Sequence, residues 1–471
     1  MSAKGLPESA AKGVYDNILG TVGRTPLVRL STFDKDLKVP IYAKVEFFNP
    51  GGSVKDRIGI NIIDEAERSG RLKPGGTVVE ATSGNTGVGL AIVCALRGYK
   101  AVFVMPDKMS QEKIQLLRAY GARVVITPTA VAPEDPRSYY KVADRIVEET
   151  PNSILANQYH NPENPRSHYL STGPEIWEQT DGQVTDVVIG MGTGGTISGV
   201  GKYLKEQNPD VQIVGIDVEG SILKEIWEND GNIPDGAEAI TYKVEGIGED
   251  FLPTAYDLSV IDHIVRVNDK ESFMTARRLV AQEGIFSGGS AGSAIAGAVR
   301  YARDLPEGRI VVVLLPDSGS RYLSKLFDDK WMRENGFLDT EWSEATIREV
   351  LQAKGHGELI SASPQDRIMH VVGKMKDNGI SQLPVMNGGQ EVIGLVRESE
   401  LLSHLLESEH EHPADETIEA MLKPAPPTVA ASEHLSNVMA DIVKHNVVMV
   451  SDGGQIVGIL TKIDVLDFIH R

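Results

Sequence analysis

The stretch VVEATSGNTGVGLAIV, residues 78–93, decides the fold of this 471-residue chain. A β-branched run ends in a turn of threonine, serine, glycine and asparagine, and an apolar helical pattern follows at once. Such strand–turn–helix units are typical of parallel sheets, whose turns gather at one edge. The turn at 82–87 offers hydroxyls, an amide and backbone N–H groups at a helix N-terminus, which together favour a bound carboxylate. Those residue types also favour plain turns, but a capped turn needs fewer of them.

The same alternation extends on both sides, from about residue 40 to residue 320. Apolar runs predict strands at 41–47, 77–82, 101–106, 123–128, 186–191, 212–218 and 309–316. Amphipathic segments that end at or near glycine or asparagine predict helices at 61–70, 87–98, 113–121, 198–208 and 272–284. Continuous apolar strands predict an α/β fold of parallel-rich sheets with helices on both faces. The number of strands fits two such three-layer sheets better than one.

Residues 341–471 have a different character, with 10 Lys+Arg against 20 Asp+Glu. They contain an internal repeat, because EVIGLVRESELL at 391–402 matches QIVGILTKIDVLDF at 455–468. We therefore expect a main domain at 1–340, a linker at 341–360, and two α+β repeats at 361–410 and 420–471. The acidic stretch 407–419 between the repeats carries histidines without the spacing of a metal site, so we expect an exposed connector and no metal.

Composition excludes several classes of function. The net charge is −19 and lysine and arginine do not cluster, so nucleic acid is not an expected partner. No apolar run reaches the roughly 20 residues of a membrane span, and the first residues lack a signal-peptide core. The single cysteine, Cys94, rules out an intramolecular disulfide. A cytoplasmic location follows as the default.

The segment KVEFFNPGGSVKDRIG, residues 44–59, places a lysine at the start of a predicted helix. Ser53 can cap that helix, which puts Lys55 in its first turn, where the helix dipole disfavours an ammonium. A lysine with a lowered pKa suits Schiff-base chemistry. From this segment alone, an ordinary surface lysine fits equally well.

Two further glycine-rich turns open helices. GTGGT at 192–196 lets the backbone close on one phosphate, but it is neither a P-loop nor a dinucleotide fingerprint. GGSAG at 288–292 places Ser290 where its hydroxyl could meet a ring nitrogen, although a helix cap would look the same. Together with Lys55 and the 82–87 turn, these segments imply an aldehyde, a phosphate, a ring nitrogen and a carboxylate. Pyridoxal phosphate with an amino acid supplies all four.

In this order and spacing, NPGGSVKDR, TSGNTG, GTGGT and GGSAG resemble the fold-type II pyridoxal-phosphate enzymes, and among them the cystathionine β-synthase family. The resemblance covers about 14–335, and the C-terminal repeats are similar to the paired regulatory CBS modules of that family. It implies that Lys55 holds the cofactor as a Schiff base and moves the Cα proton. Further implied cofactor contacts are Asn85, Gly192, Thr193, Gly194, Gly195, Thr196 and Ser290. Implied substrate contacts are Thr82, Ser83, Thr86, Gln158, Tyr159, Glu245 and Gly246.

A serine at the ring nitrogen is a weaker electron sink than an aspartate, which favours loss of a β-substituent. The implied reaction is β-replacement through an aminoacrylate, in which L-serine and L-homocysteine give L-cystathionine and water in transsulfuration toward cysteine. Acidic residues around 245–250 could meet the amino group of homocysteine. The alternatives are a cysteine synthase that uses O-acetylserine and sulfide, an O-acetylserine-dependent cystathionine synthase, and a serine or threonine dehydratase. A fourth is a degraded catalytic half that carries a working nucleotide sensor.

The resemblance also bears on other ligands. Animal members of the family carry an N-terminal haem segment with Cys and His ligands, and residues 1–14 contain neither, so haem is not expected. In the second repeat Thr461 and Asp464 suit the two hydroxyls of a ribose, which predicts at most one adenosyl site, for S-adenosylmethionine or AMP. A simple helix cap fits the same two residues. The family resemblance suggests a homodimer or a higher homo-oligomer.

Overall fold

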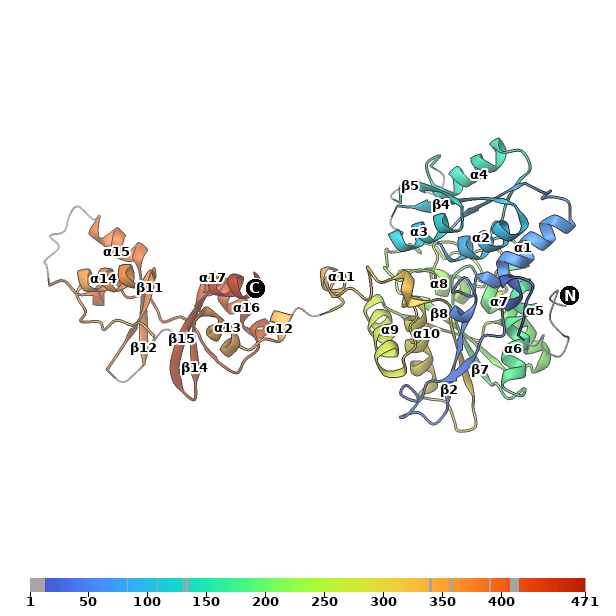
Figure 1. Ribbon diagram of the computed structural model, residues 1–471. Coiled ribbons are helices and arrows are strands. Elements are labelled where there is room, and N and C mark those ends of the chain that lie inside the picture. The colour runs from blue at the N-terminus through green and yellow to red at the C-terminus, as the bar shows by residue number, and fades with distance from the viewer. Residues whose placement is uncertain are drawn as a thin grey trace. The chain divides into compact units, whose positions relative to one another are not determined.

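The computed structural model of the protein describes residues 13–82, 84–107, 109–129, 131, 135–338, 341–355, 359–388, 391–406 and 415–470. These residues fall into two units that divide between Phe337 and Leu338, and each is described by itself (Figure 1).

The larger sheet of the first unit has the order β1-β2-β10-β7-β8-β9. All neighbouring strands are parallel except β1, which is antiparallel to β2. Every residue of β10 is buried, as expected for a central strand covered on both faces. The strands are β1 (Leu27–Arg29), β2 (Ile41–Val45), β7 (Asp186–Gly190), β8 (Gln212–Val218), β9 (His263–Val267) and β10 (Val311–Leu315).

Helices cover both faces of this sheet. Successive residues of a strand point to opposite faces. In β8, a Cβ on Gly215 would lie 3.5 Å from Ile197 of α7, whereas the next residue, Ile216, contacts α10 at Gly297. Helices α7 and α10 therefore lie on opposite faces. The helices of this part are α5 (Glu163–Leu170), α6 (Thr172–Gln179), α7 (Gly195–Gln207), α8 (Leu223–Glu228), α9 (Asp269–Glu283), α10 (Gly289–Ala302) and α11 (Asp329–Glu334).

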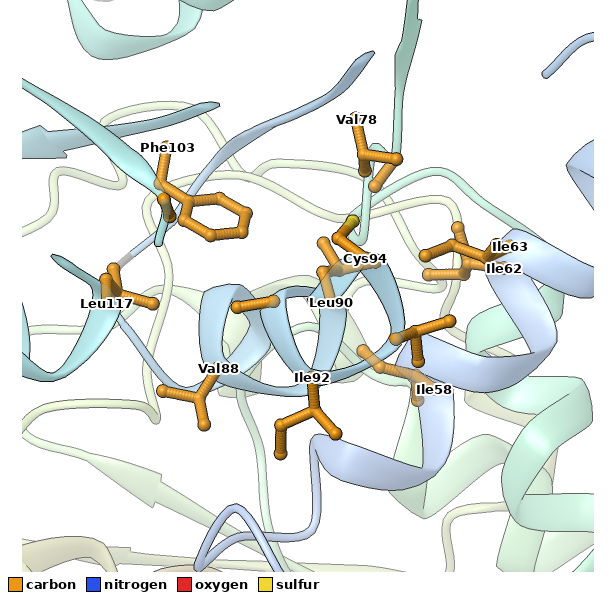
Figure 2. Close-up of a cluster of buried hydrophobic side chains, with 14 of the residues drawn as sticks. Ile58, Ile62, Ile63, Val78, Val88, Leu90, Ile92, Cys94, Phe103 and Leu117 are labelled. Carbon is orange, nitrogen blue, oxygen red and sulfur yellow. The ribbon is translucent and has the colours of Figure 1, made fainter. Parts of the chain in front are cut away.

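The smaller sheet has the order β5-β4-β3-β6 and is parallel throughout. On one face, side chains from α1, α2 and β3 form the cluster drawn in Figure 2, which includes Ile58, Leu90, Cys94 and Val78. On the other face, α4 packs on Val79. The prediction of two parallel-rich, three-layer sheets is confirmed. The elements are β3 (Thr77–Ala81), β4 (Lys100–Pro106), β5 (Arg123–Thr127), β6 (Ser153–Leu155), α1 (Asp56–Arg68), α2 (Asn85–Arg97), α3 (Gln111–Ala119) and α4 (Tyr139–Glu149).

The second unit contains the repeat seen in the sequence. Gly394 lies in β12 and Gly458 in β15, at matching positions of two β–β–α segments. Helix α13 lies inside the segment expected to be a linker, and its residues Ile347 and Val350 pack in the core of the second repeat. The elements are α12 (Glu341–Glu344), α13 (Ile347–Lys354), α14 (Ile368–Asn378), β11 (Gln382–Met386), β12 (Val392–Arg397), α15 (Glu398–Leu405), β13 (Thr428–Ala430), α16 (Leu435–His445), β14 (Val447–Asp452), β15 (Gln455–Thr461) and α17 (Lys462–His470).

Candidate active site

Lys55 lies at the N-cap position of α1, directly after the turn that follows β2. The sequence predicts Ser53 as the cap and Lys55 in the first turn, but α1 begins one residue after Lys55 and no side chain caps it. Ser53 instead accepts the backbone N–H of Lys55 over 3.3 Å, in the turn before the helix. The Lys55 side chain is half-buried. Burial lowers the pKa of the Lys55 ammonium, and the negative charges of Asp317 and Glu249 offset only part of that shift. The amine is thus biased toward the neutral form that attacks an aldehyde.

A close helix crossing fixes where Lys55 stands. Helices α1 and α2 touch backbone to backbone at Gly59 and Gly89. A Cβ on Gly59 would lie 2.6 Å from the carbonyl of Gly89, and a Cβ on Gly89 would lie 2.5 Å from the carbonyl oxygen of Lys55. No side chain fits at either position. The crossing therefore holds Lys55 against the start of α2, which is the helix that the 82–87 turn opens.

The 82–87 turn meets the predicted residue Gln158 from a distant part of the chain. The Thr86 hydroxyl donates to Oε1 of Gln158, and Thr82 Oγ1 accepts the N–H of Gly84 at 3.0 Å. Thr82, Thr86 and Gln158 are all buried. Ser83 lies outside the described residues. Hydroxyl and amide groups held in this way can bind a carboxylate.

Glu80 supports this arrangement and was not singled out by the sequence. It is buried near the end of β3, and its carboxyl group accepts the backbone N–H groups of Asn157 at 2.6 Å and Gln158 at 3.1 Å. Glu80 thereby holds the loop that carries Gln158. Burial outweighs these two hydrogen bonds and raises the pKa of Glu80 to about 8.

The raised pKa of Glu80 predicts that the stability of the unsubstituted protein depends on pH. The folded state keeps the Glu80 proton while the unfolded state releases it, because the usual pKa is 4.5 and the folded value is about 8. The contribution of Glu80 to the free energy of unfolding is greatest below pH 4.5, the usual pKa. It falls by about 1.4 kcal/mol per pH unit as the pH rises from that value to the folded pKa of about 8. Glu80→Gln should remove that slope. Urea unfolding of both proteins between about pH 5 and about pH 8 measures it; parallel pH profiles would refute the assignment.

The glycine-rich turn at 192–196 forms a cradle at the start of α7. A Cβ on Gly194 would collide with the ring of Tyr256, and a Cβ on Gly195 would collide with the Asn164 amide. The first N–H groups of an α-helix have no partner within the helix, and glycine lets an anion approach them closely. A turn of this kind can hold one phosphate. The backbone at the start of this turn is held in place, because the Tyr256 hydroxyl donates to the Gly192 carbonyl at 2.9 Å.

Two buried side chains link the cradle to the rest of the site. Asn164 donates to the carbonyl of Gln158 at 2.8 Å and to the Thr193 hydroxyl at 3.0 Å. His168 lies 3.2 Å from the Thr196 hydroxyl. Burial, reinforced by the positive charge of Lys55, lowers the pKa of His168 well below its usual value, so this histidine is neutral.

The strand end at β10 adds a residue that the sequence analysis missed. Asp317 is buried, and its Oδ2 accepts the Asn85 amide at 2.8 Å. Its backbone pairs with Ser53, two residues before Lys55, and its carbonyl accepts the N–H of Gly288 at 3.2 Å. Asp317 therefore joins the lysine turn, Asn85 and the turn that precedes Ser290. The signal in the sequence was an acid directly after a fully apolar strand, in LLPDSG at 314–319.

Ser290 is buried and is the second residue of α10, whose N-cap is Gly288. A hydroxyl in the first helical turn can face a ligand without bringing a charge. This location fits the expected partner of a ring nitrogen.

Three of the expected substrate contacts, Glu245, Gly246 and Tyr159, lie in different surroundings. Both carboxylate oxygens of Glu245 are paired, one with Lys113 and one with Lys325 at 2.6 Å. Burial opposes ionisation of Glu245, but the two lysines outweigh it and hold its pKa below the usual value. The next residue, Gly246, is exposed. The Tyr159 ring is tilted against the ring of Phe251, with 5.4 Å between the ring centres, and lines a cavity of about 390 Å³.

Thr461 and Asp464 meet where β15 passes into α17. The backbone N–H and the hydroxyl of Thr461 both donate to Asp464 Oδ2 at 2.7 Å, and Lys354 pairs with the same oxygen at 2.9 Å. Among the described residues, no group of three or more His, Cys, Asp or Glu side chains could hold a metal. None of the described helices is long and apolar enough to cross a membrane.

Comparison with known proteins places these features in context. Residues 18–317 match the family model described as pyridoxal-phosphate dependent enzyme, and residues 345–407 and 418–471 match CBS domains. The chain is 43% identical over 427 residues to a cystathionine beta-synthase of Rattus norvegicus, covering 89% of this chain and 74% of the relative. It is 40% identical over 476 residues to one of Dictyostelium discoideum, covering 98% and 93%. A crystal structure of O-ureido-L-serine synthase is similar with 38% identity and a TM-score of 0.60, covering 68% and 99%.

Proposed function

Because the chain belongs to the pyridoxal-phosphate dependent enzymes and carries paired CBS domains, we propose that it joins L-serine to L-homocysteine by β-replacement. The products are L-cystathionine and water, a step of transsulfuration toward cysteine. The observation that carries the proposal is the convergence of Lys55, the 82–87 turn and the phosphate cradle, linked through Gln158 and Asn164. The relative from Dictyostelium discoideum, which is similar along both units, supports the same substrates.

Different residues of the site bind the cofactor, bind the substrate and transfer the proton. When bound, pyridoxal phosphate supplies the electron sink for the amino acid's α-carbon. The Lys55 amine holds the cofactor, takes the Cα proton of serine and returns a proton to the departing hydroxyl, so that water leaves. Gly192–Thr196 hold the phosphate, and Ser290 presents a neutral hydroxyl to the ring. Thr82, Ser83, Thr86 and Gln158 orient the serine carboxylate.

A product assay tests this function against its alternatives. The full chain with pyridoxal phosphate is given serine or O-acetylserine as donor and homocysteine, sulfide or no thiol as acceptor, and products are identified by mass spectrometry. We expect cystathionine from serine and homocysteine as the fastest reaction. Cysteine from O-acetylserine and sulfide as the fastest product, or a keto acid that ignores homocysteine, would overturn the proposal.

Recognition of homocysteine needs a partner for its amino group, which sulfide lacks. We propose Glu249 for this role, beside Glu245, whose carboxylate also pairs with two lysines. Glu249 is half-buried, and its charge contributes to the shifted pKa values of both Lys55 and Tyr159, so it lies near the site.

Glu249→Gln should therefore raise the KM for homocysteine about tenfold, the cost of one hydrogen bond to a charged group, while sulfide kinetics change much less, because only the charge near Lys55 is altered. Asp250→Asn is the matched control, because Asp250 is the exposed neighbour. Steady-state kinetics with each acceptor give the comparison. Equal losses with homocysteine and sulfide would show that Glu249 supports the fold of the site and not the acceptor.

For the CBS pair we propose one adenosyl ligand, S-adenosylmethionine or AMP, held through ribose hydroxyls by Thr461 and Asp464. Asp464 is already oriented by Thr461 and Lys354. Calorimetric titration of the full chain should show binding that Asp464→Asn weakens at least about tenfold, because a ribose hydroxyl loses a charged acceptor. Asp467→Asn, an exposed carboxylate on the same helix, should bind normally. Equal affinity in both variants would exclude this site.

We also propose a homodimer in the cytoplasm. The resemblance to the family supports the dimer. Light scattering of the purified chain measures the oligomeric state.

A further inference from the structure

The side chain of Asn85 stands between an acid and an arginine. Its Nδ2 donates to Asp317 Oδ2 at 2.8 Å, and its Oδ1 accepts from Nη1 of Arg321. Both partners are buried, with Asp317 1% and Arg321 4% exposed. These partners come from the segment after β10, more than 200 residues away in the sequence.

This pair fixes which way the Asn85 amide points. A carboxylate only accepts hydrogen bonds and a guanidinium only donates them. A flipped amide would turn its oxygen toward Asp317 and its NH₂ group toward Arg321, and both charge-assisted hydrogen bonds would be lost. An amide NH₂ carries two hydrogens, and Asp317 takes one. The second N–H is left as a donor whose direction is set by the two charged neighbours.

The two charged residues are themselves held in place. Tyr322 donates to Asp317 Oδ2 at 2.6 Å, and Arg321 also donates to the carbonyl of Gly51, in the turn before Lys55. The other carboxylate oxygen, Asp317 Oδ1, is buried and has no hydrogen-bond partner among the described residues. It faces Gly288, where an added Cβ would collide with it.

We propose that Asp317 and Arg321 are positioning residues that fix the Asn85 amide as a hydrogen-bond donor toward the ring oxygen of pyridoxal phosphate. This inference rests on the cofactor site of the proposed function but not on the identity of the substrates. Without the pair, the amide could turn its own oxygen toward the cofactor oxygen, and two acceptors would then face each other. The acid and the arginine thus act through Asn85 and need not touch the cofactor.

A double-mutant cycle tests the inference on the full chain. The cofactor is removed, and its affinity is measured by fluorescence titration of the apoprotein with pyridoxal phosphate, together with the visible spectrum of the complex. Asp317→Asn keeps the shape but removes the charge, and it should weaken binding about tenfold, which corresponds to about 1.4 kcal/mol, and shift the spectrum. In an Asn85→Ala background, the same substitution should change affinity by less than about twofold, because the group it orients is gone.

Two further variants separate positioning from general damage. Ser320→Ala removes an exposed hydroxyl from the same segment but keeps the acid, the arginine and Asn85, so affinity and spectrum should stay near the values of the unmodified protein. Arg321→Met removes the donor to the oxygen of the Asn85 amide and should weaken cofactor binding as Asp317→Asn does. It replaces Asp317→Asn in the test if Asp317→Asn does not fold. Equal losses with and without Asn85, or unchanged affinity in both Asp317→Asn and Arg321→Met, would overturn the inference. Failure of the parent chain to bind the cofactor would instead overturn the proposed function.

Discussion

Lys55→Ala should abolish cystathionine formation, with a loss of at least about 10³-fold, because one residue supplies both the covalent anchor and the proton transfer. The alanine variant has no amine at the start of α1 to hold the cofactor or to move the proton. The visible absorbance of the lysine-linked cofactor should also disappear. Activity assays and spectra of the purified variant, loaded with pyridoxal phosphate, measure both effects.

Lys202→Ala serves as the matched control, since Lys202 is exposed on α7, the helix that the phosphate cradle opens. It should keep parental activity and absorbance. If Lys55→Ala instead retains most of its turnover, the assignment of the anchor is wrong, whatever the reaction is.

Arg57→Met should lower the free energy of unfolding of the first unit by about 3–5 kcal/mol, the typical cost of removing one partner from a buried ion pair. Arg57 donates to Glu46 at 2.7 and 2.8 Å and to Glu175 at 2.7 Å, and Lys44 pairs with the same Glu175 at 2.7 Å. Burial opposes the charge on Glu46, but Arg57 outweighs it and keeps the pKa of Glu46 below its usual value. Methionine would leave that buried carboxylate with much weaker compensation.

The matched control is Arg71→Met, because Arg71 pairs with Glu65 on the surface of the same part of the chain. Exposed pairs contribute only about 0–1 kcal/mol. Urea unfolding followed by a signal from the first unit compares the two variants, since the two units need not unfold together. Equal and small losses would show that the buried network does not carry the stability assigned to it. Because Arg57 lies two residues after Lys55, this network also anchors the helix that presents the lysine.

The strands that the sequence predicts best are those buried on both faces. Runs such as VVVLL have no polar residue to break the pattern, so β10 and its neighbours follow from composition alone. The short strand β6 has three residues, too few for any periodicity, and the edge strand β9 alternates only weakly. Helix α5 carries a proline in its first turn, where proline is tolerated, and this hides the helical pattern.

The site was predictable where one local segment carries the chemistry. Lys55, the 82–87 turn and the 192–196 turn each lie at a strand-to-helix junction, and parallel topology brings such junctions together. Asp317 and Arg321 could not be predicted, because their role depends on contacts with Asn85 across more than 200 residues. Glu80 looked like an ordinary polar position in a strand, since its burial depends on the loop at Asn157 and Gln158.

Location of the cofactor's covalent attachment tests the central claim most directly. The full chain is loaded with pyridoxal phosphate, the linkage is reduced with borohydride, and the digested peptides are analysed by mass spectrometry. We predict that the cofactor mass is found on Lys55, in the peptide that contains NPGGSVKDR. Attachment at another lysine, such as Lys113, or an unlabelled Lys55 in catalytically active protein, would contradict the account.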